Sequence, residues 1–534
     1  MNVRRSVVPA AALASLLTVI PTSAAVAQDV RGTAGPDVLV GTRHDDRISA
    51  GAGDDTLVGK RGNDRLVGDR GGDVVKGGPG LDRLSGGHGE DRAHGGPGQD
   101  SLSGGRHDDF LFGEQGKDRI NGGPARDSAY PGPGGDLVRL GGGRDQLFVE
   151  VDGDPDVVDC GDGEDTVAQV VAADPADTFV HCEHLRQQLP ATPDSTAAAN
   201  GRVFALAAAG DRTIVGGSFT RLGAHARDNV GALLANGTVD PRFVADTNGE
   251  VEAVAVSADG STLFIGGTFT TVNGVARANL AAVDALTGAV WGNWSADTAG
   301  SVPTVHSLAV HGDRLYVAGK YTGIDGTGRS ELSALDTASG DVIVEFDPRP
   351  NGLVREVVVT PDGNTVFAGG GFSKLGGTSR LGHAGAVDAT DGTATTFDPV
   401  LDDGAGVVTV ALSPDGSRFF LSTQRNRIFA FDWATSNQQV WMLRGSGNMQ
   451  AIAASNTEVY IGGHWARVHG LERPYLGSLD LDTGRLTSWD TRCSGSRMGV
   501  WALLIQGSSV HVGGVFDRFG REPQRGYARF TGTP

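Results

Sequence analysis

The chain has 534 residues, 83 of them glycine, and a formal net charge of −19 at pH 7. The acidic excess is greatest in the glycine-rich first third, and no basic stripe with interleaved aromatic residues occurs. The composition therefore argues against a nucleic-acid partner and indicates cations instead. After residue 27, no segment approaches the roughly 20 apolar residues that a membrane-spanning helix needs, so we expect no transmembrane anchor.

Residues 1–27 have the pattern of a cleavable secretory signal peptide. Arg4 and Arg5 give it a positive start, residues 7–20 are apolar, and Ala25-Val26-Ala27 forms a small-residue cleavage site. We therefore expect a secreted, extracellular protein.

A strict nine-residue spacing of aspartates is the most informative pattern in the chain. Glycines cluster ahead of each aspartate, as in residues 77–85, and the second residue after it is aliphatic, with only Ala93 and Ala129 small. Composition bias alone does not produce a fixed nine-residue period, so this period indicates stacked structural units. The members are Asp37, Asp46, Asp55, Asp64, Asp73, Asp82, Asp91, Asp100, Asp109, Asp118, Asp127, Asp136 and Asp145.

The chemistry of this repeat suits a hard cation. Glycines allow tight turns that present backbone carbonyls, and Ca²⁺ takes roughly six to eight oxygen ligands. The three residues that follow the turn are long enough for one short strand, whose aliphatic side chain points inward. A disordered acidic linker is the alternative, but a linker does not need aliphatic residues in a fixed phase.

These residues resemble the repeats-in-toxin (RTX) calcium-binding nonapeptides, written GGxGxDxUx with U aliphatic. The resemblance implies that residues 29–185 form a parallel β-roll. It also implies that the aspartates above bind several Ca²⁺ ions in two rows, each fed by alternate aspartates.

Three cysteines occur. Cys160 and Cys182 lie where the nine-residue spacing is lost, and in an exported protein we predict a disulfide between them that closes the end of the roll. Cys493 is then left over, and we interpret it as a free thiol without a catalytic role.

Residues 186–202 have the composition of a linker, and a longer repeat follows over 203–534. Each copy of 42–54 residues has alternating strands and a diglycine followed by an aromatic residue, as in residues 266–269. Four strands per copy indicate a seven-bladed β-propeller, with a β-solenoid as the alternative. The copies begin near Val203, Val251, Val305, Val354, Val407, Met449 and Val500. They resemble the diglycine-Phe-Thr propeller repeats of secreted bacterial proteins.

Two copies depart from this pattern. The fifth has Leu421-Ser422-Thr423-Gln424 in place of the diglycine element, so we expect an irregular blade there. The last copy ends after its third strand, and we hypothesise that the residues before Val203 supply the missing strand.

Residues that break the repeat symmetry are the candidates for a ligand site on the propeller. They are His464, Trp465, His469, Trp441 and Met442, with core packing as the competing interpretation. One arginine per copy is interpreted as a structural clamp rather than an anion site. This set is Arg227, Arg277, Arg329, Arg380, Arg473 and Arg525. No catalytic residue can be assigned from spacing.

The sequence thus predicts an all-β, secreted calcium-binding protein in which Ca²⁺ folds and stiffens a roll that carries a propeller. We expect the propeller to bind an extracellular glycan or a cell-surface protein rather than to catalyse a reaction. The alternative is a polysaccharide hydrolase or lyase with a calcium-stabilised accessory domain. Convergent carboxylates or a His–carboxylate pair at the propeller mouth would favour that alternative.

Overall fold

The computed structural model describes residues 27–149, 152–163, 165–169, 177–182, 184–187, 189–380, 382–399, 401, 404–433, 438–468, 471–487, 489–495 and 499–532. The expected signal peptide lies outside these residues, apart from Ala27. All regular structure in the described ranges is β, and no helix there could cross a membrane. The chain divides between residues 188 and 189 into two compact units, described here one at a time.

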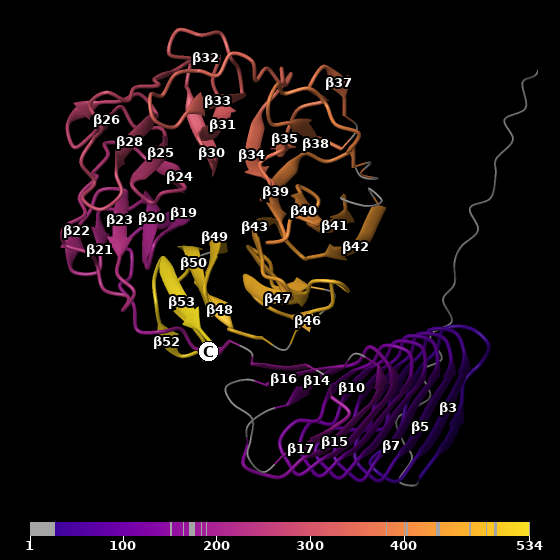
Figure 1. The fold of residues 1–534 in the computed structure, drawn as a ribbon. Coiled ribbons are helices and arrows are strands. Elements are labelled where there is room, and N and C mark those ends of the chain that lie inside the picture. Colours follow the sequence, from indigo (N-terminus) through magenta and orange to yellow (C-terminus); the bar gives the residue numbers. More distant parts are fainter. Residues whose placement is uncertain are drawn as a thin grey trace, which may run out of the picture. The chain divides into compact units, whose positions relative to one another are not determined.

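The first unit is a roll of two parallel nine-stranded sheets, as the RTX resemblance implies (Figure 1). One sheet contains β1 (Asp29–Arg31), β3 (Arg47–Ala52), β5 (Arg65–Arg70), β7 (Arg83–His88), β9 (Ser101–Arg106), β11 (Arg119–Pro124), β13 (Leu137–Gly143), β15 (Val157–Gly163) and β17 (Thr178–Val180). The other contains β2 (Val38–Val40), β4 (Thr56–Val58), β6 (Val74–Lys76), β8 (Arg92–His94), β10 (Phe110–Phe112), β12 (Ser128–Tyr130), β14 (Gln146–Val149), β16 (Thr166–Gln169) and β18 (His184–Gln187).

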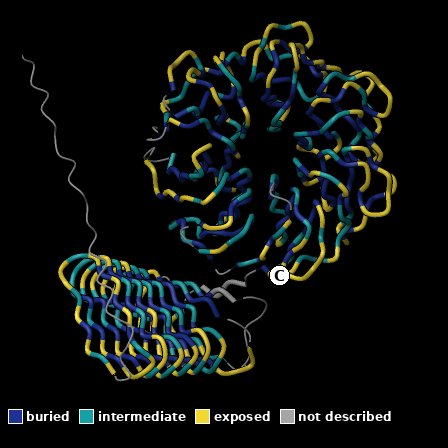
Figure 2. Tube along the Cα trace, turned by 180° about the vertical axis from the view of Figure 1, so that it is seen from behind, coloured by how far each residue is buried: buried dark blue, intermediate teal, exposed yellow. Residues whose placement is uncertain are grey.

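The aliphatic residue of each repeat forms the core of the roll. Leu84 pairs with Leu102 in the next coil, and the same register of 18 residues joins Leu57 to Val75 on the other sheet. These side chains point between the two sheets and are almost completely buried. Figure 2 shows the result, with buried strand positions and exposed turns along the coils. One such side chain per nonapeptide is buried only because the coils stack.

An aromatic stack lies on the second sheet of the roll. His94, Phe112, Tyr130 and Phe148 occupy equivalent positions in β8, β10, β12 and β14, and neighbouring rings are 4.4–4.7 Å apart between centroids. Stacked side-chain ladders of this kind stabilise flat sheets, which are otherwise uncommon.

The second unit is a closed propeller whose described residues form seven blades, each with one main sheet (Figure 1). In blade order the strands are β19 (Arg202–Ala209), β20 (Arg212–Ser218), β23 (Val230–Leu233); β24 (Val251–Val256), β25 (Thr262–Gly267), β28 (Leu280–Asp284); β30 (Thr304–His311), β31 (Arg314–Lys320), β33 (Leu332–Asp336); β34 (Val354–Val359), β35 (Thr365–Gly370), β38 (Ala384–Asp388); β39 (Val407–Leu412), β40 (Arg418–Thr423), β41 (Arg427–Asp432), β42 (Gln438–Arg444); β43 (Met449–Ala454), β44 (Glu458–Gly463), β47 (Leu476–Asp480); and β49 (Gly499–Gln506), β50 (Ser509–Val515), β53 (Tyr527–Thr531). The innermost strand of each blade contacts that of the next, and β49 contacts β19, which confirms radial closure.

The shorter strands of this unit lie between the blade strands. Hairpins after the second strand are formed by β21 (Arg221–Leu222) with β22 (His225–Ala226), β26 (Thr271–Val272) with β27 (Val275–Ala276), β36 (Lys374–Leu375) with β37 (Thr378–Ser379), β45 (Arg467–Val468) with β46 (Leu471–Glu472), and β51 (Arg518–Phe519) with β52 (Glu522–Pro523). The remaining pairs join β29 (Thr298–Ala299) to β32 (Gly323–Ile324) and β48 (Cys493–Ser494) to β51.

Each of the two glycines in the diglycine element is required for a different steric reason. A Cβ on Gly216 would lie 2.9 Å from Cγ1 of Val251 in the next blade, so the first glycine allows close packing between blades. A Cβ on Gly217 would overlap the carbonyl oxygen of Arg202 on the neighbouring inner strand. Where the seventh blade packs against the first, a Cβ on Gly513 would similarly lie 2.5 Å from Cγ1 of Val203.

The fifth blade corrects one expectation. Rather than being irregular, it is the one blade in the described residues with a continuous four-stranded sheet, β39 to β42. Its second and third strands are joined by a tight turn in which Asn426 has a positive φ of 62°. In blades with the diglycine element, a hairpin such as β21–β22 replaces this turn, and the expected fourth strand shrinks to a single bridge such as Val283–Val290.

Residues before the first blade bind to the last one. The backbone N–H of Asp194 donates to the Arg529 carbonyl at 2.7 Å, and that of Ala199 donates to the Arg525 carbonyl at 3.0 Å. The Arg529 guanidinium also binds the Asp194 carboxylate at 2.6 Å. The sheet of the last blade nevertheless has only three strands, β49, β50 and β53, so the predicted fourth strand from the residues before Val203 is not formed in the described residues.

Candidate functional site

The aspartate ladder forms two files of buried carboxylates along the roll. In each file, Oδ1 of one aspartate accepts the backbone N–H of the aspartate 18 residues earlier, as Asp100 does from Asp82 at 2.7 Å. One file runs through Asp37, Asp55, Asp73, Asp91, Asp109, Asp127 and Asp145, and the other through Asp46, Asp64, Asp82, Asp100, Asp118 and Asp136. The structure thus brings all the predicted aspartates together in two rows.

In the first member of each file, Oδ2 accepts hydrogen bonds from a nearby threonine, Thr33 for Asp37 and Thr42 for Asp46. Along the rest of the files, this second oxygen mostly has no hydrogen-bond donor. Oδ2 is buried and unsatisfied in Asp55, Asp64, Asp73, Asp82, Asp91, Asp100, Asp109, Asp118, Asp136 and Asp145. Buried polar atoms are nearly always satisfied, so a whole file of exceptions calls for an explanation. An acceptor without a donor is what a metal-ligand oxygen looks like when only protein atoms are counted.

A backbone carbonyl faces the same space as Oδ2 of Asp64, Asp73, Asp82, Asp100 and Asp118. A Cβ built on Gly95 would lie 2.6 Å from Oδ2 of Asp100 and 2.7 Å from the Gly113 carbonyl oxygen of the next coil. The two oxygens therefore converge beside the bare Cα of Gly95. Near the start of the ladder, a Cβ on Gly41 would likewise lie 2.6 Å from Oδ2 of Asp46 and 2.7 Å from the Gly59 carbonyl oxygen.

The buried files hold unbalanced negative charge. Burial raises the pKa of both Asp82 and Asp100 to about 7, and that of Asp109 to about 8. The backbone N–H donors act in the opposite direction, and neighbouring file members raise the pKa further. A cation between the coils would oppose this shift and lower the pKa again, because a nearby positive charge favours the ionised carboxylate.

The donor set selects the kind of metal. Nowhere in the described ranges do three or more His, Cys, Asp or Glu side chains gather as a possible metal site. A cation bound here would take single ladder carboxylates together with backbone carbonyls. That all-oxygen set fits Ca²⁺ and does not fit zinc, which prefers nitrogen and sulfur.

The files continue beyond the predicted ladder. Asp136 donates its backbone N–H to Asp156 at 2.7 Å, Asp145 to Asp165 at 2.7 Å, and Asp156 to Asp177 at 3.0 Å. Sequence reasoning missed these three because the spacing here is 20, 20 and 21 residues instead of 18. The signal was present, since each is followed two positions later by an apolar residue, namely Val158, Val167 and Phe179.

The cysteines lie as the sequence predicts. Cys160 in β15 and Cys182 after β17 are joined by a disulfide in the last coils of the roll. Cys493 is free and buried, and burial raises the pKa of its thiol. A buried neutral thiol is a poor nucleophile, which agrees with the interpretation that it is not catalytic.

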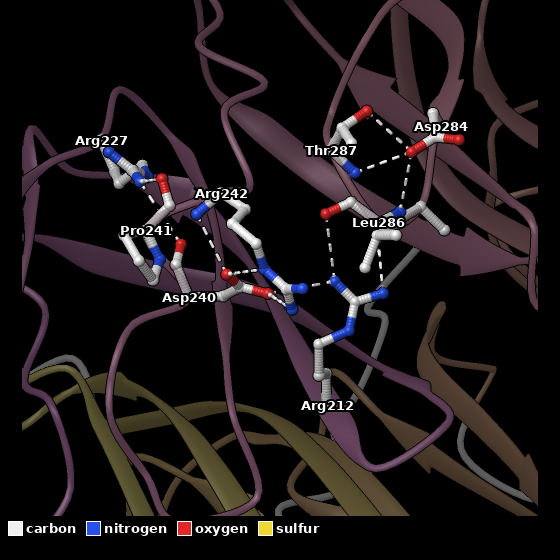
Figure 3. Close-up of polar contacts among 9 residues, drawn as sticks. Arg212, Arg227, Asp240, Pro241, Arg242, Asp284, Leu286 and Thr287 are labelled. Carbon is white, nitrogen blue, oxygen red and sulfur yellow. Dashed lines mark hydrogen bonds and ion pairs between the residues drawn. The ribbon is translucent and has the colours of Figure 1, made fainter.

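The recurring arginines are clamps within blades. Arg227 donates to the carbonyls of Ala226, Asp240 and Pro241, all in its own blade (Figure 3). Arg380 likewise binds the Phe397 carbonyl at 2.8 Å. The structural interpretation of this set is supported.

The ties between blades come from other arginines. Arg212 in β20 donates to the carbonyls of Ala285 and Leu286 in the next blade, and its guanidinium lies 3.6 Å from the buried Asp240 carboxylate (Figure 3). Arg242 binds the same carboxylate at 3.0 Å and lowers the pKa of Asp240. Sequence reasoning did not single out these residues.

The two tryptophans among the symmetry-breaking candidates are core residues. Trp465 is buried and replaces the aromatic residue of the diglycine element, and Trp441 is buried and donates to the Leu481 carbonyl at 2.9 Å. Met442 is exposed on the outer strand β42, and His469 lies outside the described residues. For the two tryptophans, the competing interpretation of core packing is therefore correct.

A cavity of about 810 Å³ occupies the centre of the propeller. Its walls are the innermost strands of the blades, and they include a His–carboxylate pair, in which His306 Nδ1 lies 2.6 Å from Glu252 Oε2. Glu356 also lines it and accepts the backbone N–H of Val410 at 3.1 Å. Sequence reasoning did not identify these residues.

Comparisons with known proteins agree with both halves of this fold. A sequence model described as the RTX calcium-binding nonapeptide repeat matches four copies, at residues 31–66, 67–102, 94–129 and 116–147. A model described as outer membrane protein assembly factor BamB matches residues 199–475, more than half of the chain. No curated protein sequence matches the chain.

Among solved structures, the chain is similar to the WD40 β-propeller domain of Doa1, with 12% identity and a TM-score of 0.42. That similarity covers 64% of this chain and 97% of the other. The chain therefore belongs to the β-propeller family of the model described as BamB, and it carries RTX calcium-binding nonapeptide repeats in the roll that precedes the propeller.

Proposed function

We propose that this is a secreted protein in which several Ca²⁺ ions bind along the two aspartate files and fold and stiffen the roll. The observation that supports this most is the run of buried, unsatisfied Oδ2 atoms, five of which, from Asp64 to Asp118, face a carbonyl of the neighbouring coil. Asp37 to Asp145 would supply one carboxylate per nonapeptide, and Asp156, Asp165 and Asp177 would extend the files.

Calcium binding and folding would then be one process. Each nonapeptide contributes a single apolar side chain to the core, which is little to set against the entropy of ordering nine residues. The ionised files would also repel each other within the coils. A divalent cation removes the repulsion and links adjacent coils, so the free energy of binding becomes free energy of folding. Extracellular calcium modules bind in the range of roughly 10⁻⁴–10⁻³ M, which suits folding outside the cell.

The propeller would serve as the domain that binds a glycan or a cell-surface protein outside the cell. Propellers are scaffolds for many functions, so this part of the proposal depends on the site rather than on the fold. A second candidate function is polysaccharide hydrolysis or cleavage, which the Glu252–His306 pair in the central cavity favours. Glu252→Gln would abolish product formation from polysaccharide if that pair were catalytic, whereas a propeller that only binds would form no product with either residue.

Hydrogen exchange of the mature chain, measured by mass spectrometry, tests the calcium proposal directly. Peptides from residues 29–187 should exchange rapidly in a chelator and become protected when millimolar calcium is added. Peptides from residues 203–532 should be equally protected in both conditions, and magnesium should not replace calcium. Equal protection of the roll with and without calcium would refute the proposal.

A further inference from the structure

A β-bulge recurs at the same position on every innermost strand of the propeller. The register shifts between the first and third residue of each repeat, for example between Val251 and Ala253, so that the residue between them has no partner on the second strand. The unpaired residues are Phe204, Glu252, His306, Arg355, Val408, Gln450 and Trp501. Bulges commonly re-aim a side chain at a functional site.

All seven of these residues line the central cavity. The residue before each bulge is buried in every blade, as are Val251 before Glu252 and Val500 before Trp501. The bulge residues themselves are partly or fully exposed. The repeated backbone feature therefore presents one side chain per blade to the cavity.

The seven side chains are all different, although the backbone around them repeats. Positions that serve the fold keep their residue type from blade to blade, as the buried valine before the bulge does in six of the seven repeats. A ring that repeats in backbone and varies in side chain is expected of a ligand site built on a symmetric scaffold.

The aromatic members gather on one side of this bulge ring. Phe204 and Trp501 belong to the first and seventh blades, which adjoin, and their rings meet edge to face with centroids 5.5 Å apart. They supply a broad apolar wall in a cavity whose size lies within the range of small-molecule sites, roughly 300–1,000 Å³.

The polar members come from the second, third and fourth blades, with Gln450 from the sixth. Glu252 and His306 are paired, and Arg355 precedes Glu356, whose pKa is raised by burial and only partly lowered again by Arg355. Arg202 and Glu250, which also line the cavity, add one charge of each sign. Opposite charges are thus present in similar number around the cavity. Gln450 also lines the cavity, and its Oε1 is buried without a hydrogen-bond donor.

From this ring we infer that the central cavity binds a neutral carbohydrate unit, stacked on Trp501 and Phe204 and hydrogen-bonded by Glu252, His306 and Gln450. A sugar ring has an apolar C–H face that suits the electron-rich face of an aromatic ring, and hydroxyls that both donate and accept. The balanced lining charge leaves no field that would select a strongly charged ligand. This inference depends on the proposed role of the propeller as the binding domain.

Saturation-transfer difference NMR on the mature chain in excess calcium tests it. The probes are cellobiose, maltose and chitobiose as neutral sugars, with glucuronic acid and glucosamine as charged ones. At least one neutral disaccharide should bind, and more tightly than either charged sugar. Trp501→Ala should weaken binding at least tenfold. Trp291→Ala is the matched control, because Trp291 is 43% exposed and does not line the cavity.

Gln450→Ala provides a second variant that does not depend on how Trp501→Ala folds. This substitution removes the unsatisfied acceptor Oε1. It should also weaken sugar binding, and the thermal stability of the propeller should not change. Absence of binding to all three neutral sugars, stronger binding of a charged sugar, or binding that neither variant affects would each overturn the inference. Calcium-dependent protection of the roll, measured on the same sample, separates such a failure from a failure of the calcium proposal.

Discussion

Oδ1 of Asp100 accepts the backbone N–H of Asp82 from the preceding coil, while Oδ2 of the same carboxylate accepts no hydrogen bond. One carboxylate thus has two separate tasks. The first oxygen fixes the stacking of the coils, and the second faces the carbonyl of Gly113. This division explains why an aspartate is used once per nonapeptide, since no neutral side chain offers both a backbone acceptor and a charged metal ligand.

Asp100→Asn separates the two tasks. The amide oxygen can still accept the Asp82 N–H, but the charge at the second position is lost. We expect calcium affinity at this position to fall by about tenfold or more, equivalent to at least ~1.4 kcal/mol. Isothermal titration with calcium measures this change. Asp162→Asn, which removes an exposed carboxylate outside the files, should titrate like the wild type. Equal affinities for Asp100→Asn and wild type would contradict the assignment.

Gly95→Ala tests the cradle without touching a carboxylate. The new methyl group would lie within 2.7 Å of both Asp100 Oδ2 and the Gly113 carbonyl, in the space that a cation would occupy. We expect more calcium to be needed to protect the roll from proteolysis. Gly35→Ala is the control, because a Cβ there meets nothing within 4 Å. If both variants have the same calcium midpoint, the space beside Gly95 is not a metal site.

The sequence predicted the roll because its information is local and periodic. Each aspartate and its aliphatic neighbour lie within three residues, so the coil and its core are visible in one nonapeptide. Asp156, Asp165 and Asp177 were missed because insertions break the phase while leaving the local motif intact. A search for Asp followed two positions later by an apolar residue, without a fixed period, would have found them.

The propeller cavity was invisible for a different reason. Its lining residues, such as Glu252 and Trp501, are the variable second residue of each repeat, and pattern analysis discards variable positions. Only the register between first and second strands shows that a bulge directs them inward. The sequence also did not reveal that the fifth blade has a continuous four-stranded sheet. The diglycine element accompanies the hairpin after the second strand, and its absence suggested a distorted blade as long as that hairpin was unknown.

The disulfide should stabilise the end of the roll. Cys160 and Cys182 are 22 residues apart, and closing a loop of that size is worth about 3 kcal/mol in the chain-entropy model. We expect the double variant Cys160→Ala/Cys182→Ala to need more calcium for protection of β15 to β18, with earlier coils less affected. Peptide mapping without reduction should recover the linked pair. Cys493 should react with iodoacetamide only after unfolding, because it is buried. Labelling of Cys160 and Cys182 in unreduced protein would contradict the disulfide.

Glu356 should make the stability of the propeller depend on pH. Burial in the cavity wall raises its pKa from 4.5 to about 7, against the opposing effects of Thr409, Val410 and Arg355. Between these two values the folded propeller holds a proton that the unfolded chain has released, so its stability falls as pH rises through this window. Above about 7 the loss is complete, at roughly 3 kcal/mol. Glu356→Gln stays neutral and should lose nothing over the same range.

Urea unfolding followed by tryptophan fluorescence measures this difference cleanly, because all seven tryptophans of the chain lie in the propeller repeats. The relevant quantity is the free energy of unfolding of wild type minus that of Glu356→Gln at each pH. Taking this difference removes the contributions of every other titrating group that the two proteins share. We expect it to decrease between about pH 4.5 and pH 7 and to be flat on either side. A difference that stays constant across that window would show that Glu356 is already ionised in the folded propeller and that the cavity is more open to water than its walls indicate.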